Sequence, residues 1–351
     1  MHVHNGTIAE TSAVNTQPLV SIVTPVYNTA EYLSECIESV LSQSYQNWEY
    51  VILDNQSTDG SARIAEEYAR KDPRIRLVRA DVHLRQLPNF NRALRLISPR
   101  SVYCKMLLAD DWLFPECIER MVRLAEGAPR VGIVACYLLQ DGRHVSCQGP
   151  AYSRPVLTGR EACRLHLLRH VSLFGTPTSV LYRSEIVRRR NAFYPESSLM
   201  GDTEACHDIL KDWDFGFVHQ VLAAARVRDG SIFDNSLDFN PFTLQKLITL
   251  YKYGRNCLSA AELHTQWDVL SKEYRGHLGE CALRGADAAF WEYHRRGWEA
   301  MDFSVTRARL AWCALVALAD YVLNPKRTVE RVFKKLRSQW NRVSTPAGDH
   351  S

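Results

Sequence analysis

The chain has 351 residues, 46% of them apolar and 10% aromatic, which fits a globular protein of about two domains and excludes a disordered or low-complexity chain. Its 43 basic and 39 acidic side chains leave a formal charge of +4, too small to indicate nucleic-acid binding, and we expect no nucleic-acid partner. Ten cysteines occur without a C-x-x-C pair, which argues against a zinc or thioredoxin-like site and indicates reduced, buried thiols in a cytoplasmic protein.

Strand-like and helical patterns alternate through the first half of the chain, which predicts an α/β domain with a mostly parallel central sheet. Residues 19–24 are a β-branched run that stops at Pro25, and residues 33–41 place apolar side chains along one helical face. The following elements are predicted in this order: a strand at 48–53, a helix at 60–69, a strand at 75–78, a helix at 88–97, a strand at 102–108, a helix from Pro115 and a hairpin over 131–147 that turns at Asp141-Gly142.

After residue 158 the pattern becomes mainly helical, with short strands expected near Val180 and over 217–227, and beyond Asn240 it predicts helices only. Residues 1–17 have neither the basic start nor the apolar core of a secretory signal. We therefore expect four parts: a flexible lead-in at 1–17, an α/β domain at 18–240, an all-helical region at 241–343 and a flexible tail at 344–351.

The carboxyl ends of three predicted strands carry polar motifs. These are Thr24–Asn28, Asp54–Gly60 and Ala109–Asp111. Ligands of open α/β sheets bind at such strand ends, so these motifs are the places to look for a site. Neither the G-x-G-x-x-G pattern nor the G-x-x-x-x-G-K-[S/T] pattern occurs, which argues against a dinucleotide fold and a P-loop NTPase.

The adjacent carboxylates of Asp110 and Asp111 have two interpretations. A pair of hard oxygen ligands after a buried strand suits Mg²⁺ or Mn²⁺, which can neutralise a departing diphosphate. Alternatively, one of the two caps the helix expected near Pro115. Taken singly, Asp54 and Asp59 fit turn and capping residues better than ligands.

Considered together, the three motifs favour the functional interpretation. Their order and spacing over residues 19–231 resemble the family 2 glycosyltransferases, whose catalytic domain has the GT-A fold. The segment Asn89–Leu94 resembles the N-x-N-x-A-L variant found in part of that family. The resemblance implies an inverting enzyme that transfers a sugar from a nucleotide-sugar donor.

The resemblance also implies roles for individual residues. Pro25, Val26 and Tyr27 would line the nucleobase pocket, Asp54 would accept a hydrogen bond from the base, and Asn91 would belong to the donor site.

The third motif would hold the ribose and a divalent cation, Mn²⁺ or Mg²⁺, through Asp110 and Asp111. Leu108 stands where the family's D-x-D-D motif usually begins with aspartate, which weakens the ribose contact. Arg228 stands at a usual histidine position. Because arginine does not ligate metals, Arg228 would instead neutralise the diphosphate and make the enzyme less dependent on metal.

An inverting transfer needs a base for the acceptor hydroxyl. In the family this base is an aspartate near the acceptor, which corresponds here to Asp202, with Glu204 in reserve. The alternative is that Asp202 caps a helix beginning at Thr203.

We therefore expect a non-processive inverting glycosyltransferase, because the Q-x-x-R-W signature of processive synthases is absent. UDP is the favoured carrier, and the acceptor would be a saccharide, a lipid-linked intermediate or a small molecule, in surface polysaccharide or glycolipid synthesis. Leu108 and Arg228 motivate the alternative of a non-catalytic sugar-nucleotide-binding or scaffold protein on the same fold. A nucleotidyltransferase is disfavoured because no Gly-rich basic turn follows the first strand.

The C-terminal region leaves a second question open. An apolar run at 310–319 precedes a segment that contains seven Lys or Arg residues and one acidic residue, Glu330. The favoured interpretation is a buried helix followed by a solvated basic helix. The other is that residues 310–343 lie on anionic lipid, which would make the protein peripheral to the inner face of the membrane.

Overall fold

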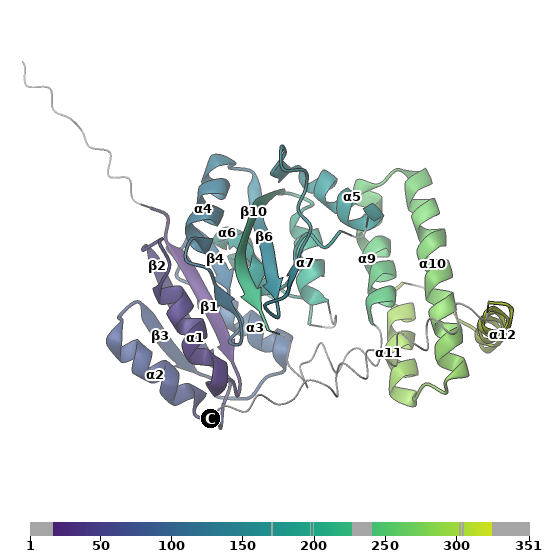
Figure 1. Cartoon of the computed structure of the whole chain (residues 1–351), viewed down its shortest axis with the longest axis horizontal. Coiled ribbons are helices and arrows are strands. Elements are labelled where there is room, and N and C mark those ends of the chain that lie inside the picture. The colour runs from purple at the N-terminus through teal and green to yellow at the C-terminus, as the bar shows by residue number, and fades with distance from the viewer. Residues whose placement is uncertain are drawn as a thin grey trace, which may run out of the picture. The chain divides into compact units, whose positions relative to one another are not determined.

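The computed structural model describes residues 17–169, 171–196, 198, 200–226, 241–301, 303 and 305–324 (Figure 1). The chain divides into two compact units, residues 1–227 and 228–351. The boundary predicted near residue 240 lies outside the described residues and stays a prediction, as do the lead-in and the tail.

A mixed sheet forms the centre of the N-terminal unit. Its strands lie in the order β3-β2-β1-β4-β9-β6-β10-β5, while β7 pairs with β6 and β8 with β10. The bounds are β1 Val20–Val26, β2 Trp48–Asp54, β3 Ile75–Arg79, β4 Tyr103–Met106, β5 Trp112–Leu113, β6 Val131–Gln140, β7 His144–Ser146, β8 Val156–Leu157, β9 Val180–Arg183 and β10 Asp214–Ala225. The predicted α/β fold is confirmed, including the hairpin that β6 and β7 form.

Helices connect these strands. Their bounds are α1 Ala30–Leu41, α2 Ser61–Lys71, α3 Gln86–Leu94, α4 Cys117–Gly127, α5 Gly159–Arg169, the 3₁₀ turn η1 Pro177–Ser179, α6 Ser184–Arg188 and α7 Gly201–Ile209. The predicted ends are displaced by a few residues, and β5, β8 and η1 were not predicted. The helix predicted from Pro115 begins at Cys117 with Glu116 as its N-cap, so neither Asp110 nor Asp111 caps it and that alternative is wrong.

The order of the strands brings several carboxyl ends to one edge of the sheet. Strands β3, β2, β1 and β4 are parallel, and the order of connection reverses at β1. Strand β9 is antiparallel to both β4 and β6, so β6 and its parallel neighbour β10 run in the direction of β4. The residues that follow β1, β2, β4 and β10 therefore share the edge at which α/β sheets bind ligands.

The C-terminal unit is helical in the part that the structure describes, as predicted. Its helices are α9 Pro241–Cys257, α10 Ala260–Leu283, α11 Ala288–Glu299 and α12 Arg307–Leu323. A buried hydrogen-bond chain joins α10 to α11: the Trp298 indole donates to the Tyr274 hydroxyl at 2.6 Å, and that hydroxyl lies 2.7 Å from His294 Nδ1. Such a satisfied polar network fixes the helices in one arrangement.

The exposure of helix α12 differs from the expectation for the apolar run at 310–319. The apolar run at 310–319 is helical but is not buried, because Trp312 is 68% exposed and Leu315 is 58% exposed. The favoured interpretation of a buried helix is therefore wrong. None of the described helices is long and apolar enough to cross a bilayer.

Helix α12 packs on α10 through a close backbone approach at Gly279. A Cβ atom there would lie 2.2 Å from the carbonyl oxygen of Cys313, a distance at which the two helices must separate. At Gly276, in the same helix, a Cβ atom would meet nothing within 4 Å. The two glycines thus form a matched pair.

We expect Gly279→Ala to lower the free energy of unfolding of the C-terminal unit by roughly 1–3 kcal/mol through overpacking. Gly276→Ala should instead raise it by about 0.5–1 kcal/mol, because alanine favours the helix. Chemical denaturation followed by tryptophan fluorescence measures both. A Gly279→Ala protein as stable as the wild type would show that the two helices are not in contact at this position.

Candidate active site

The ends of β1 and β2 form the first wall of the strand-end site. Asp54 closes β2 and is buried, and both of its carboxylate oxygens accept the backbone N–H of Ser57, at 3.3 and 3.4 Å. Pro25 and Val26 are buried within β1, so any contact that they make with a ligand must use the backbone at the strand end. Tyr27, in contrast, is 47% exposed and presents its ring at the edge of the sheet.

Two residues that the sequence analysis did not single out complete this wall. The ring of His83 lies against that of Tyr27, with 4.4 Å between centroids. Asn55 holds the segment that contains His83 in place. Its side-chain NH₂ donates to the carbonyl of Leu84 at 2.8 Å, and its side-chain oxygen accepts the Leu84 N–H at 3.0 Å. A paired aromatic surface of this kind suits stacking against a planar base.

The loops that follow β1 and β2 hold each other in place. The carboxylate of Asp59 accepts the N–H of Ala30 at the start of α1 and that of Ser61 at the start of α2, at 2.8 and 3.0 Å. Burial opposes the charge on Asp59, but hydrogen bonds from Ser61 and Ala30 outweigh it and lower the pKa of this carboxyl. Asp59 is therefore a turn residue, as predicted, that joins the starts of α1 and α2. The predicted capping role is wrong, because the N-caps of these helices are Thr29 and Gly60.

Asp111 is the centre of the opposite wall. Its carboxylate is 2% exposed and accepts the hydroxyl of Thr178 at 2.5 Å and the backbone N–H of Arg226 at 3.3 Å. Burial raises the pKa of Asp111 to about 7, and the neighbouring charge of Asp110 raises it further, against the hydrogen bond from Thr178. One carboxylate thus joins the end of β4, η1 and the end of β10.

Arg226 follows β10, and its side chain contacts the segment that bears Asp110 and Asp111. Its guanidinium donates to the backbone carbonyl of Asp110 at 2.8 Å and pairs with Glu35 of α1. It also lies over the rings of Trp112 and Tyr32, 4.6 and 5.0 Å from their centroids. A planar guanidinium suits such stacking, so the side chain is fixed beside Asp110.

A buried lysine fixes the position of Thr178. Lys105 of β4 is fully buried, and its Nζ donates to the carbonyls of Thr178 and, at 3.2 Å, of Val180. The Thr178 hydroxyl in turn accepts the N–H of Leu108 at 3.2 Å. These contacts lie beneath the Asp110–Asp111 pair and align the segment that bears it.

The pair is suited to a divalent cation that also binds phosphate. The described part of the chain contains no cluster of three or more His, Cys, Asp or Glu able to hold a metal ion. Mg²⁺ sites often combine one or two carboxylates with substrate phosphates and water, so a single carboxylate of the pair would meet this requirement if a diphosphate were bound. Asp111 uses both oxygens internally, which leaves the half-buried Asp110 as the better ligand.

Asp202 lies in the first turn of α7. The helix begins at Gly201 with Met200 as N-cap, so the predicted cap of a helix starting at Thr203 is wrong, although the Asp202 carboxylate accepts the Thr203 N–H at 2.7 Å. Burial raises the pKa of Asp202 to about 6. Glu204, the reserve candidate, is buried in the same turn.

Tyr194 connects Asp202 to the end of β4. Burial raises the pKa of the Tyr194 phenol, and the charge of Asp202 is close enough to raise it further. The Tyr194 hydroxyl lies 4.0 Å from Sδ of Met106, the last residue of β4. Tyr194 thus contacts the end of β4, and Asp202 lies within electrostatic range of its phenol.

The structure gives Asn91 of α3 a positioning contact. Its side chain exchanges hydrogen bonds with the backbone of Tyr194 at 2.8 and 2.9 Å and donates to the carboxylate of Glu196 at 2.9 Å. The residue thus anchors the segment that leads into α7. Its predicted place in the donor site stays a prediction, and Arg228 lies outside the described residues.

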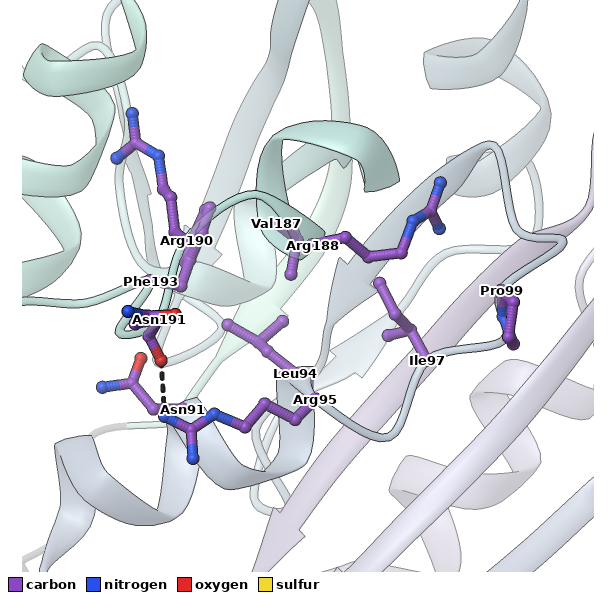
Figure 2. Close-up of a pocket in the computed structure, with 10 residues that line it drawn as sticks. All are labelled: Asn91, Leu94, Arg95, Ile97, Pro99, Val187, Arg188, Arg190, Asn191 and Phe193. Carbon is purple, nitrogen blue, oxygen red and sulfur yellow. Dashed lines mark hydrogen bonds between the residues drawn. The ribbon is translucent and has the colours of Figure 1, made fainter.

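A separate pocket of about 260 Å³ opens beyond Asn91 (Figure 2). Leu94, Ile97 and Phe193 contribute apolar side chains, and Arg95, Arg188 and Arg190 stand around them. Ile97 and Pro99 precede β4, so this pocket faces the amino end of the strand and is distinct from the strand-end site.

The comparison with protein families decides the class of the N-terminal unit. Residues 21–190 match the model of Glycosyl transferase family 2. This part of the chain is a family 2 glycosyltransferase domain. Tyr27, Asp54, Asp110 and Asp111 all lie within the matched residues, whereas Asp202 and Arg226 lie beyond them.

Curated relatives match parts of this glycosyltransferase domain. The glycosyltransferase-type protein EpsE of Bacillus subtilis (strain 168) is 38% identical over 114 residues, which are 32% of this chain and 40% of EpsE. TuaG of the same organism, a glycosyltransferase-type protein of teichuronic acid biosynthesis, is 38% identical over 108 residues, 31% of this chain and 42% of TuaG. The match thus spans less than half the length of either relative.

Two solved structures confirm the GT-A fold. S. aureus TarS 1–349 in complex with UDP-GlcNAc has a TM-score of 0.59 and 14% identity, over 90% of this chain and 91% of that one. The mannosyltransferase PcManGT from Pyrobaculum calidifontis, in complex with GDP-Man and Mn²⁺, has a TM-score of 0.51 and 16% identity, over 90% and 83%.

Thr178 provides a test of the Asp111 corner in the glycosyltransferase domain. Thr178→Val keeps the shape but removes the hydroxyl that donates to the buried carboxylate, so we expect a loss of about 1–3 kcal/mol in the free energy of unfolding. Thr178→Ser keeps the hydroxyl and should lose far less. Urea denaturation measures both variants, and equal stability of the two would contradict the assigned hydrogen bond.

Proposed function

We propose that the protein is a non-processive inverting glycosyltransferase that moves a sugar from a nucleoside-diphosphate donor to a hydroxyl group of an acceptor. The observation that carries this proposal is the pairing of two walls at one sheet edge. Tyr27 and His83 follow β1 and β3, and Asp54 ends β2. Asp110 and Arg226 follow β4 and β10, and all of these residues except Arg226 lie within the family 2 match. The first wall suits a nucleobase and the second an anion.

In this proposal the donor lies across the point at which the strand order reverses. The base stacks on Tyr27, Asp54 accepts a hydrogen bond from it, and the diphosphate lies toward Asp110. A bound Mg²⁺ or Mn²⁺ on Asp110, supported by Asp111, would neutralise charge on the leaving diphosphate. UDP is the favoured nucleotide, supported by the fold shared with a TarS complex that contains UDP-GlcNAc.

Asp202 is the proposed base. The acceptor oxygen attacks the anomeric carbon, the bond from that carbon to the diphosphate oxygen breaks, and the Asp202 carboxylate takes the hydroxyl proton. The electron pair of the broken bond leaves with the nucleoside diphosphate, and attack opposite the leaving group inverts the anomeric centre. A pKa of about 6 leaves Asp202 mostly ionised at neutral pH, as a base requires.

The acceptor is proposed to be a growing surface polysaccharide, a lipid-linked intermediate or a smaller saccharide. The name of TuaG, a relative in teichuronic acid biosynthesis, supports a polymer. A cytoplasmic location is supported by the cysteines: all ten are free thiols, and nine are buried, the state expected in a reducing compartment.

Donor binding is tested by thermal shift with a panel of nucleoside diphosphates and sugar nucleotides, with and without Mn²⁺. A ligand that binds only the folded state raises the melting temperature, so one nucleotide should raise it by several degrees in the wild type. Asp110→Ala should lose the Mn²⁺-dependent part. Asp81→Ala, which removes an exposed surface aspartate, is the matched control and should behave as wild type.

The same panel separates the enzyme from the scaffold alternative. Nucleotide release from a sugar nucleotide, lost in Asp202→Asn while binding is kept, supports the enzyme. Binding without turnover under any acceptor would favour a sugar-nucleotide-binding scaffold. No shift with any nucleotide would overturn both.

The pH profile tests the base. Because the base must be ionised, kcat/KM should rise about tenfold from about pH 5 to about pH 7 and then level off, following a pKa near 6. Asp202→Asn should lose at least about a hundredfold in rate, the usual contribution of a positioned base. If Glu204→Gln abolishes turnover and Asp202→Asn does not, the base assignment passes to Glu204.

A further inference from the structure

Helix α12 presents an unpartnered apolar face. Six large apolar side chains in this helix are between 48% and 77% exposed, namely Trp312, Leu315, Val316, Leu318, Val322 and Leu323. Five of them, with Ala319, recur at the spacing of one helical side. A contiguous apolar surface of this kind on a soluble domain marks an interaction site.

The packing of the C-terminal unit explains why this face stays open. Helix α12 is held on α10 by a narrow side on which only Cys313 and Ala317 are buried. The close approach at Gly279 leaves no room to rotate the helix inward. A hydrogen bond from Arg284 to the Tyr321 hydroxyl at 3.2 Å fixes the rotation near its end. The wide apolar side is therefore turned outward by the fold.

The charges around this face are strongly basic. Arg307 and Arg309 begin the helix, and its one acid, Asp320, accepts a hydrogen bond from Asn324. Directly after the helix the sequence carries seven basic residues and a single acid, Glu330, in a segment outside the described residues. The basic residues are Lys326, Arg327, Arg331, Lys334, Lys335, Arg337 and Arg342.

An exposed apolar face next to many basic residues favours one kind of binding partner over the others. A second copy of the chain would cover the apolar residues but would bring two sets of cations together. An anionic lipid surface covers the apolar residues with acyl chains and also attracts the basic segment. We propose that the apolar face of α12 docks on an anionic membrane surface and lies in the interface. The basic residues that follow α12 in the sequence supply the electrostatic attraction.

This docking goes beyond the proposed glycosyl transfer and does not depend on it. It would bring the glycosyltransferase domain to a membrane surface, where lipid-linked substrates are found. Interfacial binding requires no membrane-spanning helix, and the length and exposure pattern of α12 suit a helix that lies in the membrane plane.

The test is sedimentation of the full chain with sucrose-loaded vesicles. Vesicles of phosphatidylcholine alone are compared with vesicles that also contain phosphatidylglycerol. We expect the partition coefficient to be at least about tenfold higher with the anionic lipid and to fall as salt is raised, because the basic segment supplies the electrostatic part.

The double variant Trp312→Ser/Leu315→Ser should lose most of this binding. Its matched control is Val269→Ser/Leu283→Ser, which removes two exposed apolar side chains of α10 and should keep it. The melting temperature and the helical circular dichroism signal should be unchanged in both variants, which shows that the chain is folded.

Three outcomes would overturn the proposal. The first is a wild-type chain that stays in the supernatant with anionic vesicles, and the second is equal loss of binding in both double variants. The third is a wild-type dimer in analytical ultracentrifugation that Trp312→Ser/Leu315→Ser dissociates, without vesicle binding, which would assign the face to a second copy. None of these depends on whether the donor site is active.

Discussion

The buried carboxylate of Asp111 is the constraint on which the strand-end site depends. It lies where β4, η1 and β10 meet, and its hydrogen bonds to Thr178 and Arg226 join segments far apart in sequence. A buried carboxylate without these donors would be costly, so the three segments are held together by the need to satisfy it. Its neighbour Asp110 is thereby placed at the edge of the sheet, where a diphosphate would lie.

The rest of the site follows from strand order. The reversal at β1 places the polar loops of β1 and β2 opposite those of β4 and β10, and Asp59 fixes the first pair of loops by joining α1 to α2. Asn91 anchors the segment that leads to Asp202, so the proposed base is positioned from the same part of the sheet. Hydrogen bonds between these side chains and the backbone thus position the proposed donor wall, diphosphate corner and base.

The sequence was sufficient to predict the longer strands, the motifs at their ends and the family, but not the two-residue strands β5 and β8. These signals are local: a β-branched run, an adjacent carboxylate pair or a turn residue can be recognised without knowing what lies nearby. Thr178, Lys105 and His83 could not be found in this way, because their roles arise from contacts across the sheet with residues remote in sequence. The exposure of α12 was mispredicted for the same reason, since the apolar run does not reveal that Gly279 allows only one narrow side to be buried.

The most direct test of the account is a crystal structure of the full chain with the nucleoside diphosphate selected by thermal shift and Mn²⁺. The account predicts electron density for the base against Tyr27 and for the diphosphate beside Asp110, with the cation bound to that carboxylate. Density for the nucleotide at any other place, such as the arginine-lined pocket beyond Asn91, would contradict the assignment of the strand-end site.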